Sequence, residues 1–125
     1  VAAEATKAPR LKKSDGAIDW SRPATAIRNQ IRALDPWPKT YTYWFRQQGE
    51  PLRLIPGRTE VVADAAGEPG TAVTADAGIL VIAAGEGGLR LCEVQPAGKR
   101  MLEIRAFLNG HPVQVGDRFG NVDAD

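Results

Sequence analysis

The sequence predicts a mainly β domain with short helices: a small antiparallel β-barrel with an N-terminal amphipathic helix and a short C-terminal helix. The chain has 125 residues, of which 43% are hydrophobic and 25% charged, as expected for one soluble globular domain. Short stretches that alternate apolar and polar residues between glycine-rich turns predict several antiparallel strands. One earlier stretch has apolar residues at helical spacing instead.

The N-terminal residues have the composition of a linker. Ala, Lys, Pro, Arg and Ser predominate there, and no apolar periodicity appears. Lys7, Arg10, Lys12 and Lys13 make this segment basic. The predicted organisation is a basic interdomain linker at 1–16, the barrel domain at 17–119 and a disordered tail at 120–125.

A helix is expected near the start of the domain. Its apolar stripe is formed by residues three or four positions apart, namely Ala24, Ile27, Ile31 and Leu34. Arg28 and Arg32 lie one turn apart on the other side. The side chain of either Asp19 or Ser21 can accept hydrogen bonds from the unpaired N–H groups of the first turn. Pro36 ends the helix, because the residue before a proline is pushed out of the helical conformation.

The rest of the chain has strand and turn patterns. Strands are expected at 40–45, 52–54, 70–74, 79–83 and 89–94, and residues 60–63 extend the second strand or follow it. Glycine-containing turns are expected at 76–78 and 85–88, and a loop at 64–69. A helix over 99–109, closed by Gly110, and a last short strand or tail over 113–119 complete the prediction.

The aromatic residues adjoin expected core elements. Trp20, Trp37 and Trp44 can stack on bases, but packing of the helix onto the barrel is the favoured interpretation. The alternation of the first strand places three aromatic residues on the side opposite Thr42 and Trp44, namely Tyr41, Tyr43 and Phe45.

No catalytic or metal centre is predicted. One cysteine and one histidine cannot supply a zinc ligand set. Cys92 lies in a strand pattern, where a small buried hydrophobic residue is expected, and His111 lies in a predicted exposed loop, so a nucleophile–base pair is disfavoured. The glycine-rich stretch 85–88 opens a strand rather than a helix, and so lacks the N–H groups that cradle a phosphate.

The expected location is the cytoplasm. The longest apolar run, 79–84, is far shorter than the ~20 residues of a membrane span. The first eight residues carry charges and no apolar core, unlike a secretory signal. A single cysteine suits a reducing compartment. Since the sequence begins with Val1 and not Met, we expect a fragment or a processed product.

Charge is divided unevenly between the two halves of the chain. The net charge is +1, but residues 1–60 hold 11 Lys and Arg against 6 Asp and Glu, and residues 61–125 hold 5 against 9. A nearly neutral protein can therefore present a positive face to a polyanion.

Several motifs resemble, in the same order, the C-terminal domain of the methionyl-tRNA formyltransferase family. The matching stretches are Ile-Asp-Trp at 18–20, Ile-Arg-Ala-Leu at 31–34, Pro-Trp-Pro at 36–38, Glu-Pro-Gly-Thr at 68–71, the strands at 78–81 and 87–91, Val-Gln-Pro-Ala-Gly-Lys-Arg-Met at 94–101, Phe-Leu-Asn-Gly at 107–110 and Val-Gly-Asp at 115–117. Stretch 94–101 is similar to the family's glutamine, glycine, lysine and methionine signature. Two departures are Arg53, where many relatives have lysine, and Pro96-Ala97, which replaces more polar residues.

The resemblance implies a division of labour within a larger enzyme. It implies that the β-barrel is OB-like and is joined by a linker to an N-terminal Rossmann-type domain. That domain holds the 10-formyltetrahydrofolate site and a catalytic Asn, His and Asp. That enzyme formylates the amino group of methionyl initiator tRNA in bacterial translation initiation. No stretch of this chain matches the active-site motif, so we expect it to be inactive alone, to bind no cofactor or metal, and to hold the tRNA electrostatically.

Lys and Arg suit this role because phosphate contacts position an RNA without reading its sequence. A solvated surface cation is the alternative interpretation for each residue. The residues predicted to bind tRNA are Arg10, Lys12 and Lys13 in the linker, Lys99 and Arg100 in the signature and, in second rank, Arg28, Arg32 and Lys39.

Two other classes of function stay open. The chain could be a scaffold or assembly domain of a sugar or folate formyltransferase that does not bind tRNA; Lys99-Arg100 beside Met101 and the Pro-Trp-Pro turn favour the tRNA branch. It could also be a free-standing OB-like binder of single strands, which usually exposes aromatic residues interleaved with cations on adjacent strands. Only Arg46 closely follows the aromatic cluster, so this class is disfavoured.

Overall fold

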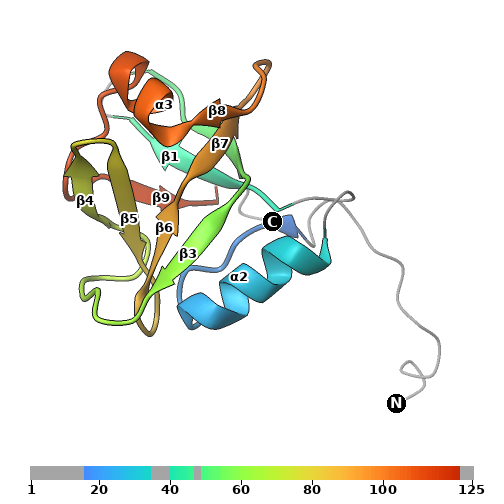
Figure 1. The fold of residues 1–125 in the computed structure, drawn as a ribbon, viewed down its shortest axis with the longest axis vertical. Helices are drawn as coiled ribbons and strands as arrows, with labels where there is room; N and C mark the ends of the chain where they lie inside the picture. The colour runs from blue at the N-terminus through green and yellow to red at the C-terminus, as the bar shows by residue number, and fades with distance from the viewer. Residues whose placement is uncertain (1–15, 35–39, 47–48, 122–125) are drawn as a thin grey trace.

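The computed structural model describes residues 16–34, 40–46 and 49–121. Figure 1 shows a β body with one helix at each end. Over the described residues, the elements in chain order are α2 (Ala24–Ala33), β1 (Thr42–Phe45), β2 (Leu52–Pro56), β3 (Thr59–Val62), β4 (Ala72–Asp76), β5 (Ile79–Ala83), β6 (Gly88–Leu91), β7 (Glu93–Pro96), β8 (Leu102–Glu103), α3 (Ile104–Gly110) and β9 (Arg118–Gly120).

The strands form two antiparallel sheets. One sheet has five strands in the order β8-β7-β2-β1-β9, and the other has four in the order β3-β6-β5-β4. The β4–β5 and β5–β6 hairpins confirm the turns predicted at 76–78 and 85–88. The predicted mainly β class with short helices is confirmed, whereas the strands that the structure describes do not form one closed barrel.

A bend at Cys92 corrects the single strand predicted over 89–94. β6 ends one residue before it and β7 begins one residue after it, and the two strands belong to different sheets. The segment between β2 and β3, which lies beside Cys92, bends at the same position along the sheets. There Cys92 N donates to Arg58 O and Gly57 N donates to Glu93 O, both at 2.8 Å. The two sheets therefore meet along this corner, and Cys92 is buried in it, as predicted.

A second seam joins β4 to β9. Phe119 N donates to Gly70 O at 2.7 Å, and further backbone hydrogen bonds follow beside it. The last strand, predicted over 113–119, is limited to β9, since a turn precedes it. β9 ends at Gly120, which is the first residue of the predicted tail, and residues 122–125 lie outside the described part of the chain.

Helix α2 confirms the predicted apolar stripe. Ala24, Ile27 and Ile31 are buried, and Leu34 is half-buried as the C-terminal cap. The helix packs against β3 and β6, and lies along one end of the β body (Figure 1).

The predicted side-chain cap of this helix is wrong. Pro23 occupies the N-cap position, without a side-chain hydrogen bond. Asp19 Oδ1 accepts instead from Ser21 N at 3.0 Å and Ser21 Oγ at 2.6 Å. The N–H of Ala24 donates to the carbonyl of Glu86 at 2.9 Å, so the β5–β6 turn satisfies a free donor of the first helical turn.

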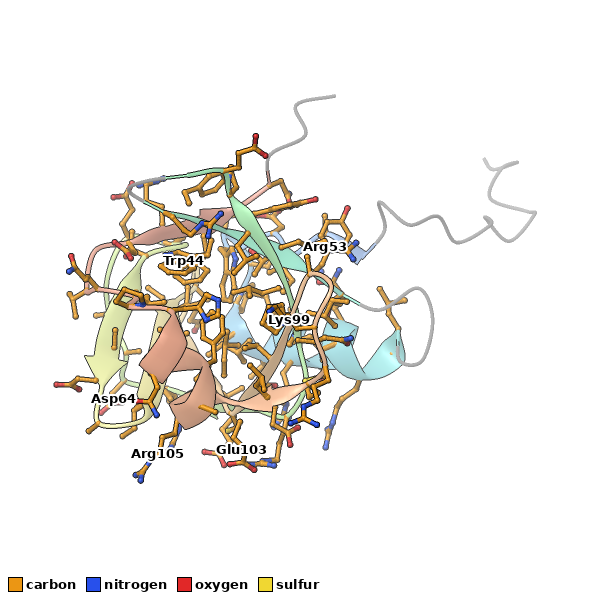
Figure 2. The ribbon with its side chains drawn as sticks, turned by 90° about the horizontal axis from the view of Figure 1, so that it is seen from above. Trp44, Arg53, Asp64, Lys99, Glu103 and Arg105 are labelled. Atoms are coloured by element: carbon orange, nitrogen blue, oxygen red, sulfur yellow. The ribbon has the colours of Figure 1, made fainter. Side chains whose placement is uncertain are left out.

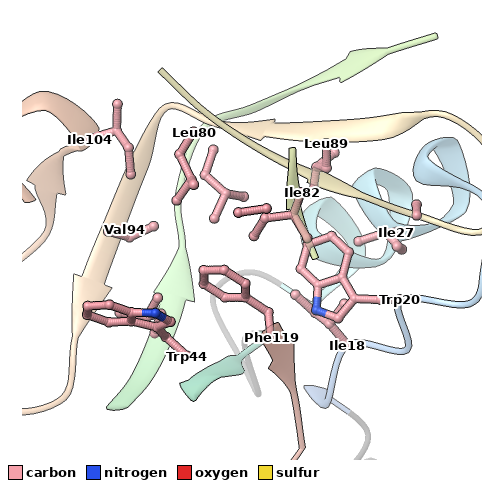
Figure 3. Close-up of a cluster of buried hydrophobic side chains, with 14 of the residues drawn as sticks. Ile18, Trp20, Ile27, Trp44, Leu80, Ile82, Leu89, Val94, Ile104 and Phe119 are labelled. Atoms are coloured by element: carbon pink, nitrogen blue, oxygen red, sulfur yellow. The ribbon is translucent and has the colours of Figure 1, made fainter. Parts of the chain in front are cut away.

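The core lies between the sheets and beneath α2. Figure 3 shows Trp20, Trp44 and Phe119 directed into it together with aliphatic residues of both sheets. Trp20 and Trp44 are only 5% and 4% exposed, which confirms that they pack in the core. Trp20 Nε1 donates to Thr42 Oγ1 and Trp44 Nε1 to Asp117 Oδ2, each at 3.0 Å. Trp37 lies outside the described residues.

Helix α3 is shorter than predicted. It begins at Ile104, because β8 pairs with β7 before the helix can start. His111, predicted in an exposed loop, is a half-buried cap of this helix. Its ring stacks on Phe107, with centroids 4.4 Å apart, and lies edge-on to Trp44.

Candidate nucleic-acid interface

Four of the eight predicted tRNA-binding residues can be located. Arg28, Arg32, Lys99 and Arg100 lie in the described part of the chain. The others lie outside it, namely Arg10, Lys12, Lys13 and Lys39.

Lys99 and Arg100 lie on an exposed hairpin between β7 and β8, which we call the basic hairpin and define as residues 96–101. This placement corrects the helix predicted to start at Lys99. Lys99 N donates to Pro96 O at 2.9 Å and closes the turn. Gln95 Nε2 donates to Lys99 O, also at 2.9 Å, so the glutamine of the signature holds the backbone from which the lysine projects.

The basic hairpin is attached to the middle of the five-stranded sheet. Ala97 N donates to Arg53 O of β2 at 2.9 Å. Figure 2 shows Arg53 and Lys99 near one another, whereas Arg105 and Glu103 lie at another edge of the molecule. Arg53 is exposed, and sequence reasoning noted it only as a departure from the family.

A hollow of about 350 Å³ lies beside this hairpin. It is bounded by the last turn of α2, the corner between β2 and β3, and the residue that follows Arg100. Thr40, only 2% exposed, contributes a buried hydroxyl without a hydrogen-bond partner. The residues that line the hollow are Ile31, Arg32, Thr40, Ile55, Pro56, Gly57, Arg58, Glu93 and Met101.

Two exposed arginines line this hollow. Arg32 lies in the last turn of α2, where its charge also complements the helix dipole. Arg58 Nη1 lies 3.4 Å from Glu93 Oε2, and an exposed pair of this kind is weak. Because Arg100 directly precedes Met101, the basic hairpin adjoins the same hollow. The structure therefore places Arg32 on a hollow that reaches the basic hairpin at Met101, and adds Arg58, which sequence reasoning missed.

Arg28 differs from these residues. It is half-buried on α2, and its Nε is buried without a hydrogen-bond partner. It does not line the hollow beside the basic hairpin. Its guanidinium is therefore less accessible to a polyanion than that of Arg32.

Three other described arginines do not line this hollow. Arg90 lies 3.9 Å from Glu60, and Arg118 lies 3.8 Å from Glu68. Arg105 lines a separate, open hollow near α3.

The signal that would have found Arg58 is its position after Gly57, at a turn between two strands, but that turn is evident only once the strands are paired.

Two properties of the described side chains bear on reactivity: how potential metal ligands are grouped, and whether a carboxylate has a shifted pKa. No three His, Cys, Asp or Glu side chains among them gather as metal ligands. The Ser21 hydroxyl and then the Ser21 backbone N–H donate to Asp19 and lower the pKa of that carboxyl. This carboxylate holds the turn before α2, so its role is structural. No helix in the described ranges is sufficiently long and apolar to span a bilayer.

Comparison with known proteins places these features in a family context. The family model described as "Formyl transferase, C-terminal domain" matches residues 10–112. The methionyl-tRNA formyltransferase of Magnetococcus marinus is 40% identical over 115 residues, which are 92% of this chain and 35% of that protein. That of Acidiphilium cryptum is 45% identical over 115 residues, with the same coverage. That of Symbiobacterium thermophilum is 43% identical over 122 residues, covering 95% of this chain and 36% of that protein. The chain thus spans about a third of the length of these curated relatives.

Proposed function

This chain belongs to the formyl transferase C-terminal domain family, and from that premise we propose that it is the tRNA-holding domain of a methionyl-tRNA formyltransferase. The parent enzyme transfers a formyl group from 10-formyltetrahydrofolate to the amino group of methionyl initiator tRNA, in the bacterial cytoplasm. The catalytic residues and the folate site belong to an N-terminal Rossmann-type domain, in the part of the relatives that this chain does not span. The chain itself holds the tRNA by charge and contributes no catalytic residue.

The grouping of cations around one hollow is the observation that carries this proposal. Arg32 and Arg58 line it, and Lys99 and Arg100 project from the adjoining hairpin. Exposed cations on neighbouring elements can neutralise successive phosphates, which releases counterions and drives binding. A single carboxylate, Glu93, lines the same hollow and compensates only part of this charge.

The linker cations extend the same surface in our proposal. The chain enters the domain at Gly16, whose carbonyl accepts a hydrogen bond from Tyr41 N at 2.8 Å. Thr40, which lines the hollow, is adjacent to Tyr41 and directly follows Lys39. The entry point of the linker is therefore close to this hollow, which we call the cationic hollow because Arg32 and Arg58 line it. This supports a role in binding for Arg10, Lys12, Lys13 and Lys39.

We also interpret the β body as an OB-like barrel that is divided at its corners. Two features support this interpretation: the shared bend of β2–β3 with β6–β7, and the seam between β4 and β9. At each of these two places, backbone hydrogen bonds connect one sheet to the other.

Binding of initiator tRNA to the 125-residue chain tests the function. Fluorescence anisotropy at several salt concentrations should give an affinity that falls steeply as salt rises. Lys99→Ala with Arg100→Ala should weaken binding and reduce the slope of log K against log salt by about one for each lost phosphate contact. The matched control, Arg90→Ala with Arg105→Ala, removes the same charge away from the hollow and should have the smaller effect.

Two results would contradict the proposal. Affinity that does not depend on salt would favour the alternative, an assembly domain of a formyltransferase that does not act on tRNA. Equal loss of affinity in the hairpin and control variants would mean that the net charge matters and not the location of Lys99 and Arg100.

A further inference from the structure

The outer face of the five-stranded sheet carries an aromatic row next to arginines. In β1, the inward side chains are the buried Thr42 and Trp44, and the outward ones are the half-exposed Tyr43 and Phe45. Tyr41, just before the strand, makes an edge contact with Tyr43, with ring centroids 6.0 Å apart and planes at 88°. We call Tyr41, Tyr43 and Phe45 the aromatic row.

Strand register places an arginine on each side of this row. Tyr43 pairs with Arg53 of β2, and Phe45 pairs with Arg118 of β9. Residues directly opposite in antiparallel strands project to the same face, with Cβ atoms about 4.5–5.5 Å apart. Both arginines are exposed. The cations that seemed to be missing from this cluster in the sequence are therefore supplied by strands distant along the chain.

Arg46, the cation that follows the aromatic residues in sequence, has a different role. Its guanidinium Nε donates to the backbone carbonyl of Glu50 at 2.8 Å and closes the loop after β1. Arg53 and Arg118 are less restrained. The described structure gives Arg53 no ion pair, and Arg118 has one contact of 3.8 Å to Glu68, with both side chains more than 60% exposed. Such a pair is readily exchanged for a phosphate.

A glycine lies beside the ring of Phe45. Gly120 of β9 is the partner of Tyr43 on the side away from Arg53. A Cβ at Gly120 would lie 3.4 Å from Cε2 of Phe45, so even a methyl group would fill the space next to that ring. Gly120 therefore adds no side chain that would compete with a ligand for the ring of Phe45.

Neither described helix packs on this face. Helix α2 packs against β3 and β6, and α3 packs against β5, β7 and β8. The outward residues of β1, β2 and β9 include no carboxylate; they are Tyr43, Phe45, Arg53, Ile55, Arg118 and Gly120. Ile55 also lines the cationic hollow, and Arg53 O is bonded to the basic hairpin, so the aromatic row and the hollow are neighbours.

We propose that this face binds unpaired nucleotides of the RNA, with bases stacked on Tyr43 and Phe45 and adjacent phosphates held by Arg53 and Arg118. An unpaired base exposes its flat face to an aromatic ring, whereas a base within a duplex does not. A face that combines aromatic rings and cations therefore distinguishes single-stranded from paired RNA. The inference rests on the proposed function for its partner, RNA, and adds the kind of RNA segment that is held.

A stacking-sensitive probe tests this directly. The 125-residue chain is titrated into a ten-nucleotide single-stranded RNA with 2-aminopurine at its centre, and into a blunt RNA duplex of the same sequence. Stacking should quench the 2-aminopurine fluorescence. Tyr43→Leu, which keeps an apolar side chain but removes the ring, should lower the affinity for the single strand at least about fivefold, and change duplex affinity less than twofold.

Controls separate stacking from folding and from charge. Tyr43→Phe retains the ring, and its affinity and quenching should equal those of the parent. Arg53→Gln, at an exposed position, should lower single-strand affinity and reduce the salt slope by about one without loss of thermal stability. If Tyr43→Leu unfolds the sheet, the single-strand affinity of Arg53→Gln still tests the proposal.

The outcomes are distinguishable from those for the basic hairpin. Unquenched fluorescence, or single-strand affinity within twofold of the parent in both Tyr43→Leu and Arg53→Gln, would overturn the inference and leave the aromatic row as a surface for a protein. Salt-independent tRNA binding would refute the proposed function instead. Quenching that is lost in Tyr43→Leu and kept in Tyr43→Phe supports stacking whatever the hairpin variants do.

Discussion

The substitution Gly85→Ala is expected to weaken the attachment of α2 to the β body. A Cβ at Gly85 would lie 1.9 Å from the carbonyl oxygen of Ser21 and 2.7 Å from its carbonyl carbon. Both atoms belong to the backbone, so no change of rotamer relieves the overlap. Since real Cβ contacts are essentially never shorter than 3.0 Å, the two segments must separate by about 1.1 Å.

The cost follows from what holds the segments together. Gly85 N donates to Arg22 O and Ala24 N donates to Glu86 O, each at 2.9 Å. Overpacking costs about 1–3 kcal/mol, and each weakened hydrogen bond adds about 0.5–1.5 kcal/mol. We therefore expect Gly85→Ala to lower the free energy of unfolding by about 2–6 kcal/mol. At roughly 3 °C per kcal/mol for a domain of this size, Tm should fall by about 6–18 °C.

Urea denaturation and thermal unfolding, both followed by circular dichroism, measure this effect. Gly110→Ala is the matched control, because a Cβ there meets nothing within 4 Å and its φ is not in the left-handed region. This control should change the free energy of unfolding by less than about 0.5 kcal/mol. If Gly85→Ala were as stable as Gly110→Ala, the close backbone contact between the β5–β6 turn and the turn before α2 would not exist in solution.

Two further substitutions test the polar contacts that orient the same elements. Asp19→Asn keeps the hydrogen-bond acceptor but removes the charge. The pKa of Asp19 is lowered in the folded state. The ionised carboxylate therefore stabilises the fold fully above the ordinary pKa of 3.8, and this stabilisation is lost as pH falls through the folded pKa. The difference in unfolding free energy between parent and variant should therefore vanish at the acid end of a urea titration between about pH 2 and 6, and a constant difference would contradict the shift. Asp117→Ala should cost about 1–3 kcal/mol in the same assay, since its Oδ2 accepts from the buried Trp44 Nε1 and from Gln114 N, each at 3.0 Å. Asp117→Asn, which retains an acceptor oxygen, should lose less, and equal losses would show that the carboxylate acts in some other way.

Features specified by neighbouring residues could be predicted from the sequence. The stripe of Ala24, Ile27 and Ile31 depends only on helical spacing, and it is buried as expected. The turns at 76–78 and 85–88 likewise follow from short signals of glycine and acidic residues, and both join paired strands.

Features that depend on long-range pairing could not be predicted from the sequence. The bend at Cys92 is hidden because apolar residues line the inner faces of both sheets, so the sequence on either side of it is similar. The helix predicted from Lys99 is delayed because Leu102 pairs with Val94. The start of α2 is satisfied by the carbonyl of Glu86, a partner that no local capping rule identifies.

The candidate site is divided in the same way. Its charged residues are recognisable from composition and from the signature around Lys99, whose conformation depends on the nearby Gln95. Its geometry is not recognisable, because Arg58 reaches the hollow only through the turn between β2 and β3. In the same way, Arg53 and Arg118 flank the aromatic row only through the pairing of β1 with β2 and β9.

One register fixes both faces of β1. The pairing that brings Trp44 opposite Phe119 in the core also brings Phe45 opposite Arg118 on the outside. A slip of one residue would reverse every side chain of the strand, so the hydrophobic core enforces the outward alignment of ring and cation. Asp117 secures this register by accepting the Trp44 N–H one residue before Arg118. The proposed RNA-binding face therefore depends on a part-buried hydrogen bond on the opposite side of the same strand. Weakening that hydrogen bond should lower the affinity for single strands although no RNA contact is removed.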